Sequence, residues 1–314
     1  MSNNINTGIL ILAFNRPKSF GKLTQDILNT SNQNIFISID GGSGAKHLQV
    51  KKLANEFKKL YPSRIQLNIM NTNHGVRFGV MKGIDWFYNN IKYGIILEED
   101  LEILIENPDK LFNSIFKFLN TNENCVFNFS TFINKSNQST NSESNLTFYR
   151  NQDFYMWGWA AHRSTWTDFK KSLNKNYISD FLRVTTNLNI SEKIYWYAIN
   201  RLVSKRQIDS WGYSFLFYSS VKKKLYVPSK AIVRNIGLLE GSNYSKLSFF
   251  HNDLKNSLSE KFILQNQGIK IVNANRIIFE KNRKVRHNIN NYSTIKAIFW
   301  NVIPVRHFLK KIKK

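Results

Sequence analysis

The sequence has one cysteine, no long apolar run and fewer than half as many acidic as basic residues. Cys125 therefore cannot form a disulfide within the chain, and the six scattered histidines lack the spacing of zinc ligands. No stretch approaches the ~18 consecutive apolar residues that a membrane-spanning helix needs. The first residues carry no basic residue ahead of their short apolar run, so we expect no secretory signal and a reduced, cytoplasmic location.

The charge balance is strongly basic. Lys and Arg number 45 against 21 Asp and Glu, which gives a formal net charge of +24. Such an excess indicates an anionic partner without choosing between nucleic acid, anionic lipid and phosphorylated small molecules. The segment 281–314 holds ten basic and no acidic residues, mixed with Ile, Phe, Trp and Val. It fits an anchor on an anionic membrane surface, and equally a solvated tail whose apolar residues dock on the core.

Apolar runs alternate with helical spacing in the first hundred residues. The runs 9–14, 34–40, 64–70 and 93–100 are typical of buried strands, and helical spacing occupies 19–31, 47–61 and 79–91. This alternation predicts an α/β fold with a mainly parallel sheet and helices on both faces. Beyond it we expect a helix over 108–119, a strand over 125–130, a polar loop over 134–145 and an aromatic-rich second half.

Polar residues follow each of the four predicted strands, where ligands of parallel sheets bind. They occupy 15–17, 40–43, 71–77 and 98–100. No glycine-rich dinucleotide or P-loop motif is present. The fourth strand runs into Glu98, Glu99 and Asp100, and strand alternation places Glu98 and Asp100 on one face. Clustered carboxylates of this kind suit Mg²⁺ or Mn²⁺ completed by substrate phosphates. The alternative is an acidic turn that caps the next helix.

Six segments stand out in chain order: ILAFNRP, ISIDGGSG, NxxHGVRxGVxxGIDWF, IILEEDLEI, YMWGWAAHRSTW and VPSKAIVRNIG. Together they resemble GT-A-fold glycosyltransferases of bacterial surface-polysaccharide clusters, which are similar in layout to the N-acetylglucosaminyltransferase I group. The resemblance covers about 9–245. It implies a GT-A, Rossmann-like sheet with a nucleotide-sugar-binding half over 1–120, an acceptor-binding half over 121–250 and a basic helical extension over 251–314.

The resemblance also implies roles for the donor side of the site. Asp100 falls on the position of the metal ligand for Mn²⁺ or Mg²⁺, and Glu98 and Glu99 fall beside the donor. Glu99 stands where the family has Asp, which lengthens that side chain. The remaining implied contacts, to the uracil, ribose or diphosphate, fall on Asp40, Arg16 and Arg77.

For the acceptor side, the resemblance implies that Asp209 is the base and that Trp211 stacks nearby, with one residue more between them than in the family pattern. Trp157 and Trp159 fall on the acceptor floor of the cleft. Arg163 falls where it binds either the diphosphate or the preceding helix. Asn243 stands where family members often carry a histidine after the N-I-G segment.

The implied activity is metal-dependent, inverting transfer of a hexosyl or N-acetylhexosaminyl group. The donor would be a nucleoside-diphosphate sugar, with UDP as the expected nucleotide. The acceptor would be a hydroxyl of a glycan or lipid-linked saccharide in surface-polysaccharide or lipopolysaccharide synthesis, at the inner leaflet of the membrane. Three alternatives remain: a basic nucleic-acid-binding protein, which we do not favour for lack of a known binding motif, a nucleotidyltransferase, and a non-catalytic glycan-binding relative.

Overall fold

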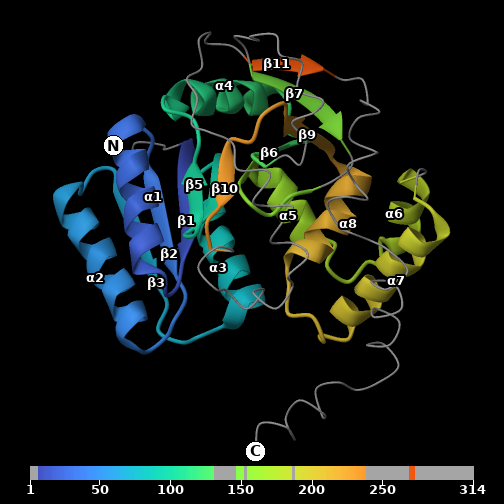
Figure 1. The fold of residues 1–314 in the computed structure, drawn as a ribbon, viewed down its shortest axis with the longest axis horizontal. Helices are drawn as coiled ribbons and strands as arrows, with labels where there is room; N and C mark the ends of the chain where they lie inside the picture. The colour runs from blue at the N-terminus through green and yellow to red at the C-terminus, as the bar shows by residue number, and fades with distance from the viewer. Residues whose placement is uncertain (1–5, 131–145, 152–153, 186–187, 238–268, 273–314) are drawn as a thin grey trace, which may run out of the picture.

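The computed structural model of the protein describes residues 6–130, 146–151, 154–185, 188–237 and 269–272 (Figure 1). Within them, a nine-stranded sheet has the order β11-β7-β9-β6-β8-β4-β1-β2-β3. Its strands are β1 (Thr7–Ala13), β2 (Ile35–Ile39), β3 (Ile65–Ile69), β4 (Tyr93–Glu98), β6 (Cys125–Asn128), β7 (Leu146–Asn151), β8 (Trp159–His162), β9 (Lys224–Pro228) and β11 (Ile269–Val272).

The four strands predicted in the first hundred residues form one parallel block, in the order β4-β1-β2-β3. Next to it, β8 is antiparallel to both β4 and β6, so that β6 and its parallel neighbour β9 point the same way as β4. The carboxyl ends of β1 to β4 therefore meet at one edge of the sheet. The amino ends of β6 and β9 lie at the opposite edge.

Helices cover both faces of the sheet. They are α1 (Pro17–Thr30), α2 (Ala45–Leu60), α3 (Gly75–Asn90), α4 (Pro108–Thr121), α5 (Arg163–Lys171), α6 (Ile178–Val184), α7 (Ile190–Ser204) and α8 (Gly212–Lys222). Pro17 and Pro108 occupy first-turn positions of α1 and α4, where proline is favoured, and a capping box between Asn189 and Glu192 begins α7. None of the helices in the described ranges is long and apolar enough to cross a membrane.

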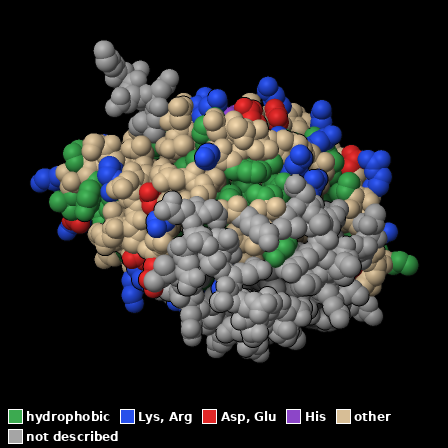
Figure 2. All heavy atoms as spheres, turned by 90° about the horizontal axis from the view of Figure 1, so that it is seen from above, with side chains coloured by type: hydrophobic (Ala, Val, Ile, Leu, Met, Phe, Trp, Pro, Cys, Tyr) green, Lys and Arg blue, Asp and Glu red, His purple; other side chains and the backbone are tan. Residues whose placement is uncertain are grey.

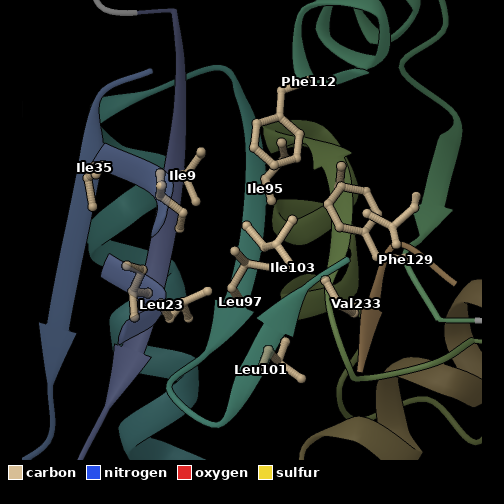
Figure 3. Packing of buried hydrophobic residues seen from close by; sticks show 14 of the residues in the cluster. Ile9, Leu23, Ile35, Ile95, Leu97, Leu101, Ile103, Phe112, Phe129 and Val233 are labelled. Carbon is tan, nitrogen blue, oxygen red and sulfur yellow. The ribbon is translucent and has the colours of Figure 1, made fainter. Parts of the chain in front are cut away.

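Side-chain alternation along β1 divides the core into two layers. Ile9 and Ile11 pack in the layer that contains α1, α2 and α4, whereas Leu10 and Leu12 pack in the layer that contains α3 and α5 to α8. Figure 3 shows the first layer, in which side chains from β1, β4, α1 and α4 converge. The predicted α/β fold, with a mainly parallel sheet covered on both faces, is confirmed.

A short second sheet extends the site-bearing end of β4. After Glu98 the chain turns through two residues into β5 (Leu101–Ile103), which pairs antiparallel with β10 (Val233–Asn235). The predicted fourth strand, 93–100, therefore ends at Glu98, because residues 99 and 100 form a turn that leads into β5. The pairing brings the VPSKAIVRNIG segment to the acidic residues, from which it is more than a hundred residues distant in sequence.

Two sequence expectations reach beyond the described residues. The polar loop 134–145 and the basic segment 281–314 both lie outside them, so their predictions stand as made. Within 251–314, the structure describes β11, which pairs parallel with β7 at the edge of the main sheet. This part of the expected helical extension is a strand.

Candidate active site

The strand-end edge brings together residues from β1, β2, β4 and β10. Asp40 follows β2, the acidic residues 98–100 end β4, and Arg16 precedes α1. The sequence predicted this gathering, because parallel strands end at a common edge. The resemblance implied contacts to a donor and a metal ion, and the structure adds the contacts that these side chains make within the protein.

Glu99 holds the loop between β1 and α1. Its two carboxylate oxygens accept hydrogen bonds from the backbone N–H groups of Phe14, at 2.8 Å, and Asn15, at 3.2 Å. The side chain is buried, and both oxygens are thus engaged by backbone donors. The structure gives Glu99 the role of a clamp on this loop, and the donor contact that the resemblance implied stays a prediction. The open alternative, an acidic turn that caps the next helix, does not describe Glu99, because the next element is the strand β5 and the donors Phe14 and Asn15 precede the N-cap of α1.

Replacing Glu99 with Gln is expected to lower the free energy of unfolding by about 1–3 kcal/mol. The amide keeps one acceptor oxygen but turns an NH₂ group toward a backbone N–H, which leaves a buried donor without a partner. Urea denaturation measures the change. Glu56→Gln on the exposed surface of α2 is the matched control. If Glu99→Gln is as stable as the wild type, Glu99 does not stabilise the β1–α1 loop.

Asp40 plays a similar part on the other side of β1. Its carboxylate accepts hydrogen bonds from the backbone N–H groups of Gly41, His74 and Gly75, at 2.9 to 3.1 Å. Gly79 of α3 packs so closely that an added Cβ would lie 2.5 Å from Asp40 Oδ2. Asp40 therefore fixes the start of α3 against the end of β2, where helix N–H groups and the dipole favour a carboxylate.

Asp100 and Arg16 form an ion pair at the tip of β4. Arg16 Nη1 donates to Asp100 Oδ2, while no partner is within hydrogen-bond geometry of the buried Oδ1 among the described residues. The nearby Asn235 side chain favours the charged form of Asp100 and lowers its pKa, against the larger effect of burial. Ile236 N–H donates to the Asp100 carbonyl at 2.9 Å, which places Gly237 directly over the pair. A Cβ on Gly237 would lie 1.9 Å from Arg16 Nη1 and 2.3 Å from Asp100 Oδ2. Any side chain at residue 237 would therefore force the ends of the Arg16 and Asp100 side chains to move.

Burial shifts the titration of all three acids at this tip. Burial first, and then the neighbouring Asp100, raise the pKa of Glu98 to about 8. Burial also raises the pKa of Glu99 above its usual range, against the lowering effect of its backbone donors. The pKa of Asp100 is raised by burial as well, although Arg16 opposes the shift. One guanidinium thus balances the negative charge of this cluster only in part.

A second group of ion pairs surrounds Glu102, two residues along the chain from Asp100. Buried Glu102 accepts from Lys22 Nζ at 2.5 Å and from Arg234 Nε at 2.6 Å. Burial alone would raise the pKa of Glu102, but these two hydrogen bonds outweigh it and the pKa lies below the usual value. Sequence reasoning missed Lys22, Arg234 and Gly237 as supports of the site. Two of them, Arg234 and Gly237, belong to the VPSKAIVRNIG segment, which the family resemblance had already singled out.

Asp209 lies beside the start of α3. Its Oδ2 is 3.4 Å from the position that a Cβ on Gly75 would occupy, and Gly75 has a φ of +75°. The side chain is exposed, so it is open to a ligand. Arg77, two residues into α3, has a buried Nε that finds no hydrogen-bond partner among the described residues. The structure therefore brings Asp209, Arg77 and Asp40 to the same helix start.

The tryptophans expected on the acceptor side lie in different surroundings. Trp159 and Trp211 are 0% and 2% exposed and pack with Trp166 and Phe215 in one aromatic cluster. Neither ring has a free face for a sugar, so the core role replaces the expected contact. Trp157 is half-buried and keeps part of its ring accessible.

Arg163 resolves an alternative that the sequence left open. Its Nε donates to the carbonyl of Ile91 at 2.8 Å, at the end of α3. This position is at the amino edge of the sheet, opposite Asp100, because Arg163 follows the strand residue that pairs with Tyr93. Arg163 therefore binds the end of α3, which is not the helix directly before it, and lies at the edge away from the expected diphosphate. Asn243 lies outside the described residues.

The described part of the chain contains no group of three His, Cys, Asp or Glu side chains placed to hold a metal ion. A Mg²⁺ or Mn²⁺ site of the kind completed by substrate phosphates needs only one or two carboxylates from the protein. The orphaned, buried Asp100 Oδ1 meets that requirement, with Glu98 close enough to interact with it electrostatically. The residues present fit such an ion, held mainly through Asp100.

Comparison with known proteins gives fold likeness only. No protein-family profile matches the chain, and no curated protein matches its sequence. Among solved structures, it is similar to the mannosyltransferase PcManGT from Pyrobaculum calidifontis in complex with GDP-Man and Mn²⁺, with 8% identity, a TM-score of 0.40 and coverage of 80% of this chain and 85% of that one.

Two further solved structures are similar at the same level. GalNAc-T7 with UDP, GalNAc and Mn²⁺ shows 12% identity and a TM-score of 0.40, over 72% of this chain and 43% of that one. A putative glucose-1-phosphate thymidylyltransferase from Bacillus anthracis shows 10% identity and a TM-score of 0.35, over 82% and 97%. The chain spans less than half the length of the GalNAc-T7 chain. At such low identity, activity must be argued from the residues of the chain itself.

Proposed function

We propose that the protein is a metal-dependent, inverting glycosyltransferase that uses a nucleoside-diphosphate sugar. The observation that carries the proposal is the buried Asp100 Oδ1, which has no hydrogen-bond partner among the described residues and lies beside Arg16 at the carboxyl end of β4. A buried carboxylate oxygen without a donor is costly unless a ligand completes it. A divalent cation with a diphosphate is the ligand that suits both an acidic oxygen and the adjacent arginine.

The donor side consists of Asp100, Glu98, Arg16 and Arg77 in this proposal. Bound Mn²⁺ or Mg²⁺ would stabilise the negative charge of the departing nucleoside diphosphate. Arg16 is already positioned by its pair with Asp100 and supplies a second positive charge. The buried Nε of Arg77, at the start of α3, supplies a further donor where a helix terminus itself favours an anion. Glu99 and Asp40 keep the two loops of the donor side in place.

The acceptor side is formed around Asp209. In an inverting transfer, the acceptor hydroxyl loses its proton as it attacks the anomeric carbon, and a carboxylate within reach takes that proton. Asp209 is exposed and lies next to Gly75, at the same edge as the donor loops. We assign Trp157 to the acceptor contact, since its ring is half-buried while Trp159 and Trp211 are enclosed.

The biological setting is part of the same proposal. The sequence resemblance supports a hexosyl or N-acetylhexosaminyl donor on UDP, and a glycan or lipid-linked saccharide acceptor in surface-polysaccharide or lipopolysaccharide synthesis. The basic residues of 281–314 support attachment to the anionic inner leaflet. Truncation after residue 280 is then expected to reduce binding to anionic vesicles. If the truncated chain binds anionic vesicles as well as the full chain does, the segment 281–314 does not attach the protein to the membrane.

The direct test is a calorimetric screen of sugar nucleotides with the full chain, in the presence of Mn²⁺ and again with EDTA. We expect one class of nucleoside-diphosphate sugar to bind with Mn²⁺ and to be hydrolysed slowly without acceptor, with both signals lost in EDTA. Failure of every sugar nucleotide to bind would contradict the proposal. Release of pyrophosphate from a nucleoside triphosphate and a sugar phosphate would instead identify a nucleotidyltransferase.

A further inference from the structure

A lysine-rich hollow lies at the amino edge of the sheet, away from the candidate active site. Its volume is about 360 Å³, and its lining includes Lys171, Lys175, Lys222, Lys223 and Asp168. It forms where α5 and α8 end, next to the starts of β6 and β9. Since β4 points the same way as these strands and is six residues long, roughly 20 Å of strand separates this edge from Asp100. Figure 2, seen from above, shows Lys and Arg side chains at many points of the surface.

Two of the lysines are held in place by contacts of their own. Lys223 Nζ lies 3.5 Å from Asp168 Oδ2 and 5.9 Å from the ring centre of Tyr218, and its side chain is only 7% exposed. Lys222 Nζ lies 5.8 Å from the ring centre of Tyr177. Aromatic faces attract ammonium groups, so these contacts fix positive charge against the wall of the hollow.

Lys171 and Lys175 complete the other side and are exposed. Among the described residues, neither lysine forms an ion pair with a carboxylate, and Asp168 is the single acid that lines the hollow. Their side chains therefore remain available to a ligand.

The negative ends of two helices balance only part of the positive charge of these lysines. The carboxyl termini of α5 and α8 each contribute roughly −0.5 of an elementary charge, which lysines in a last turn commonly balance. Together with Asp168, these ends supply about −2 against the four lysines, so a charge of about +2 remains without compensation. A phosphate monoester carries about −1.5 to −2 at neutral pH, which matches this remainder.

We propose that this hollow is a second ligand site, which binds a phosphoryl group that carries two negative charges. The group would come either from a free phosphate compound or from the headgroup of an anionic lipid, because both present the same chemistry to the lysines. The proposal does not rest on the glycosyltransferase assignment, since none of its residues belongs to the strand-end site.

The test compares Lys171→Gln/Lys175→Gln with Lys52→Gln/Lys59→Gln, a control that removes the same charge from exposed positions on α2. Calorimetry with inorganic phosphate is carried out in EDTA, which prevents metal-dependent binding at Asp100. A second arm measures sedimentation with vesicles of phosphatidylcholine that contain phosphatidic acid, against phosphatidylcholine alone.

We expect the Lys171/Lys175 variant to lose about tenfold in affinity in one of the two arms, while the control variant stays near the wild type. Loss for inorganic phosphate identifies a free phosphate compound as the ligand, and loss with phosphatidic acid vesicles alone identifies a headgroup. The proposal is overturned if neither arm shows saturable binding, or if both double variants weaken equally. Circular dichroism of each variant verifies the fold.

Discussion

Asp100→Asn is expected to lower metal-dependent transfer by about 10²–10³-fold and to abolish measurable Mn²⁺ binding in the presence of the nucleotide. The substitution keeps the shape of the side chain but removes the charge that a divalent cation requires. It also leaves Arg16 without its ionic partner. Calorimetry with Mn²⁺ and the nucleoside diphosphate measures the binding, and product formation measures the transfer.

Glu106→Gln is the matched control for this experiment. Glu106 is exposed and lies between β5 and α4, only six residues along the chain from Asp100. Removing its charge tests whether any acid near the site affects Mn²⁺ in the same way. If Asp100→Asn binds Mn²⁺ and transfers sugar as the wild type does, the metal assignment is wrong and the strand-end carboxylate serves only its ion pair with Arg16.

The second large effect concerns Asp209. Asp209→Asn is expected to reduce turnover by about 10²–10⁴-fold while donor affinity stays close to that of the wild type. The amide cannot take the proton from the acceptor hydroxyl, whereas the donor contacts proposed for Asp100, Arg16 and Arg77 remain intact. Turnover under saturating donor and calorimetric donor affinity, measured on the same preparation, separate the two effects.

Asp180→Asn is a suitable comparison, because Asp180 is a surface acid on α6 that pairs with Arg183 at 3.0 Å. Turnover of Asp209→Asn equal to that of Asp180→Asn would refute the assignment of the base. A fall in donor affinity as large as the fall in turnover would give Asp209 a binding role at the start of α3, beside Gly75.

The location of the site was predictable to a large degree. The four parallel strands lie within two residues of the expected runs at each end. The strands β1, β2 and β4 are buried on both faces and appear in the sequence as apolar runs, whereas β3 at the sheet edge is only partly buried and shows alternation. Their common carboxyl edge follows from the parallel order. The approximate place of Asp40, Arg16 and Asp100 follows from the same geometry.

The roles of individual side chains were less predictable. Glu99 and Asp100 are adjacent in sequence, yet one clamps the backbone of the β1–α1 loop and the other pairs with Arg16. A turn after β4, in place of the continued strand, sends the two carboxylates to different partners. Trp157 and Trp159 differ similarly, because β8 begins only at Trp159 and Gly158 before it has a φ of +73°, so that Trp159 is enclosed in one core layer while Trp157 packs, half-buried, against the other.

The sequence by itself determined the α/β class, the parallel block and the edge where acids and arginines gather, because periodic burial and strand-end chemistry are local properties. Only the tertiary structure decided which acid is left with an unpartnered oxygen, that Gly237 covers the Arg16–Asp100 pair, and that four lysines surround one hollow. Those facts depend on contacts between segments far apart in the chain, through the pairing of β5 with β10 and the meeting of α5 with α8. Patterns of neighbouring residues in the sequence do not predict such contacts.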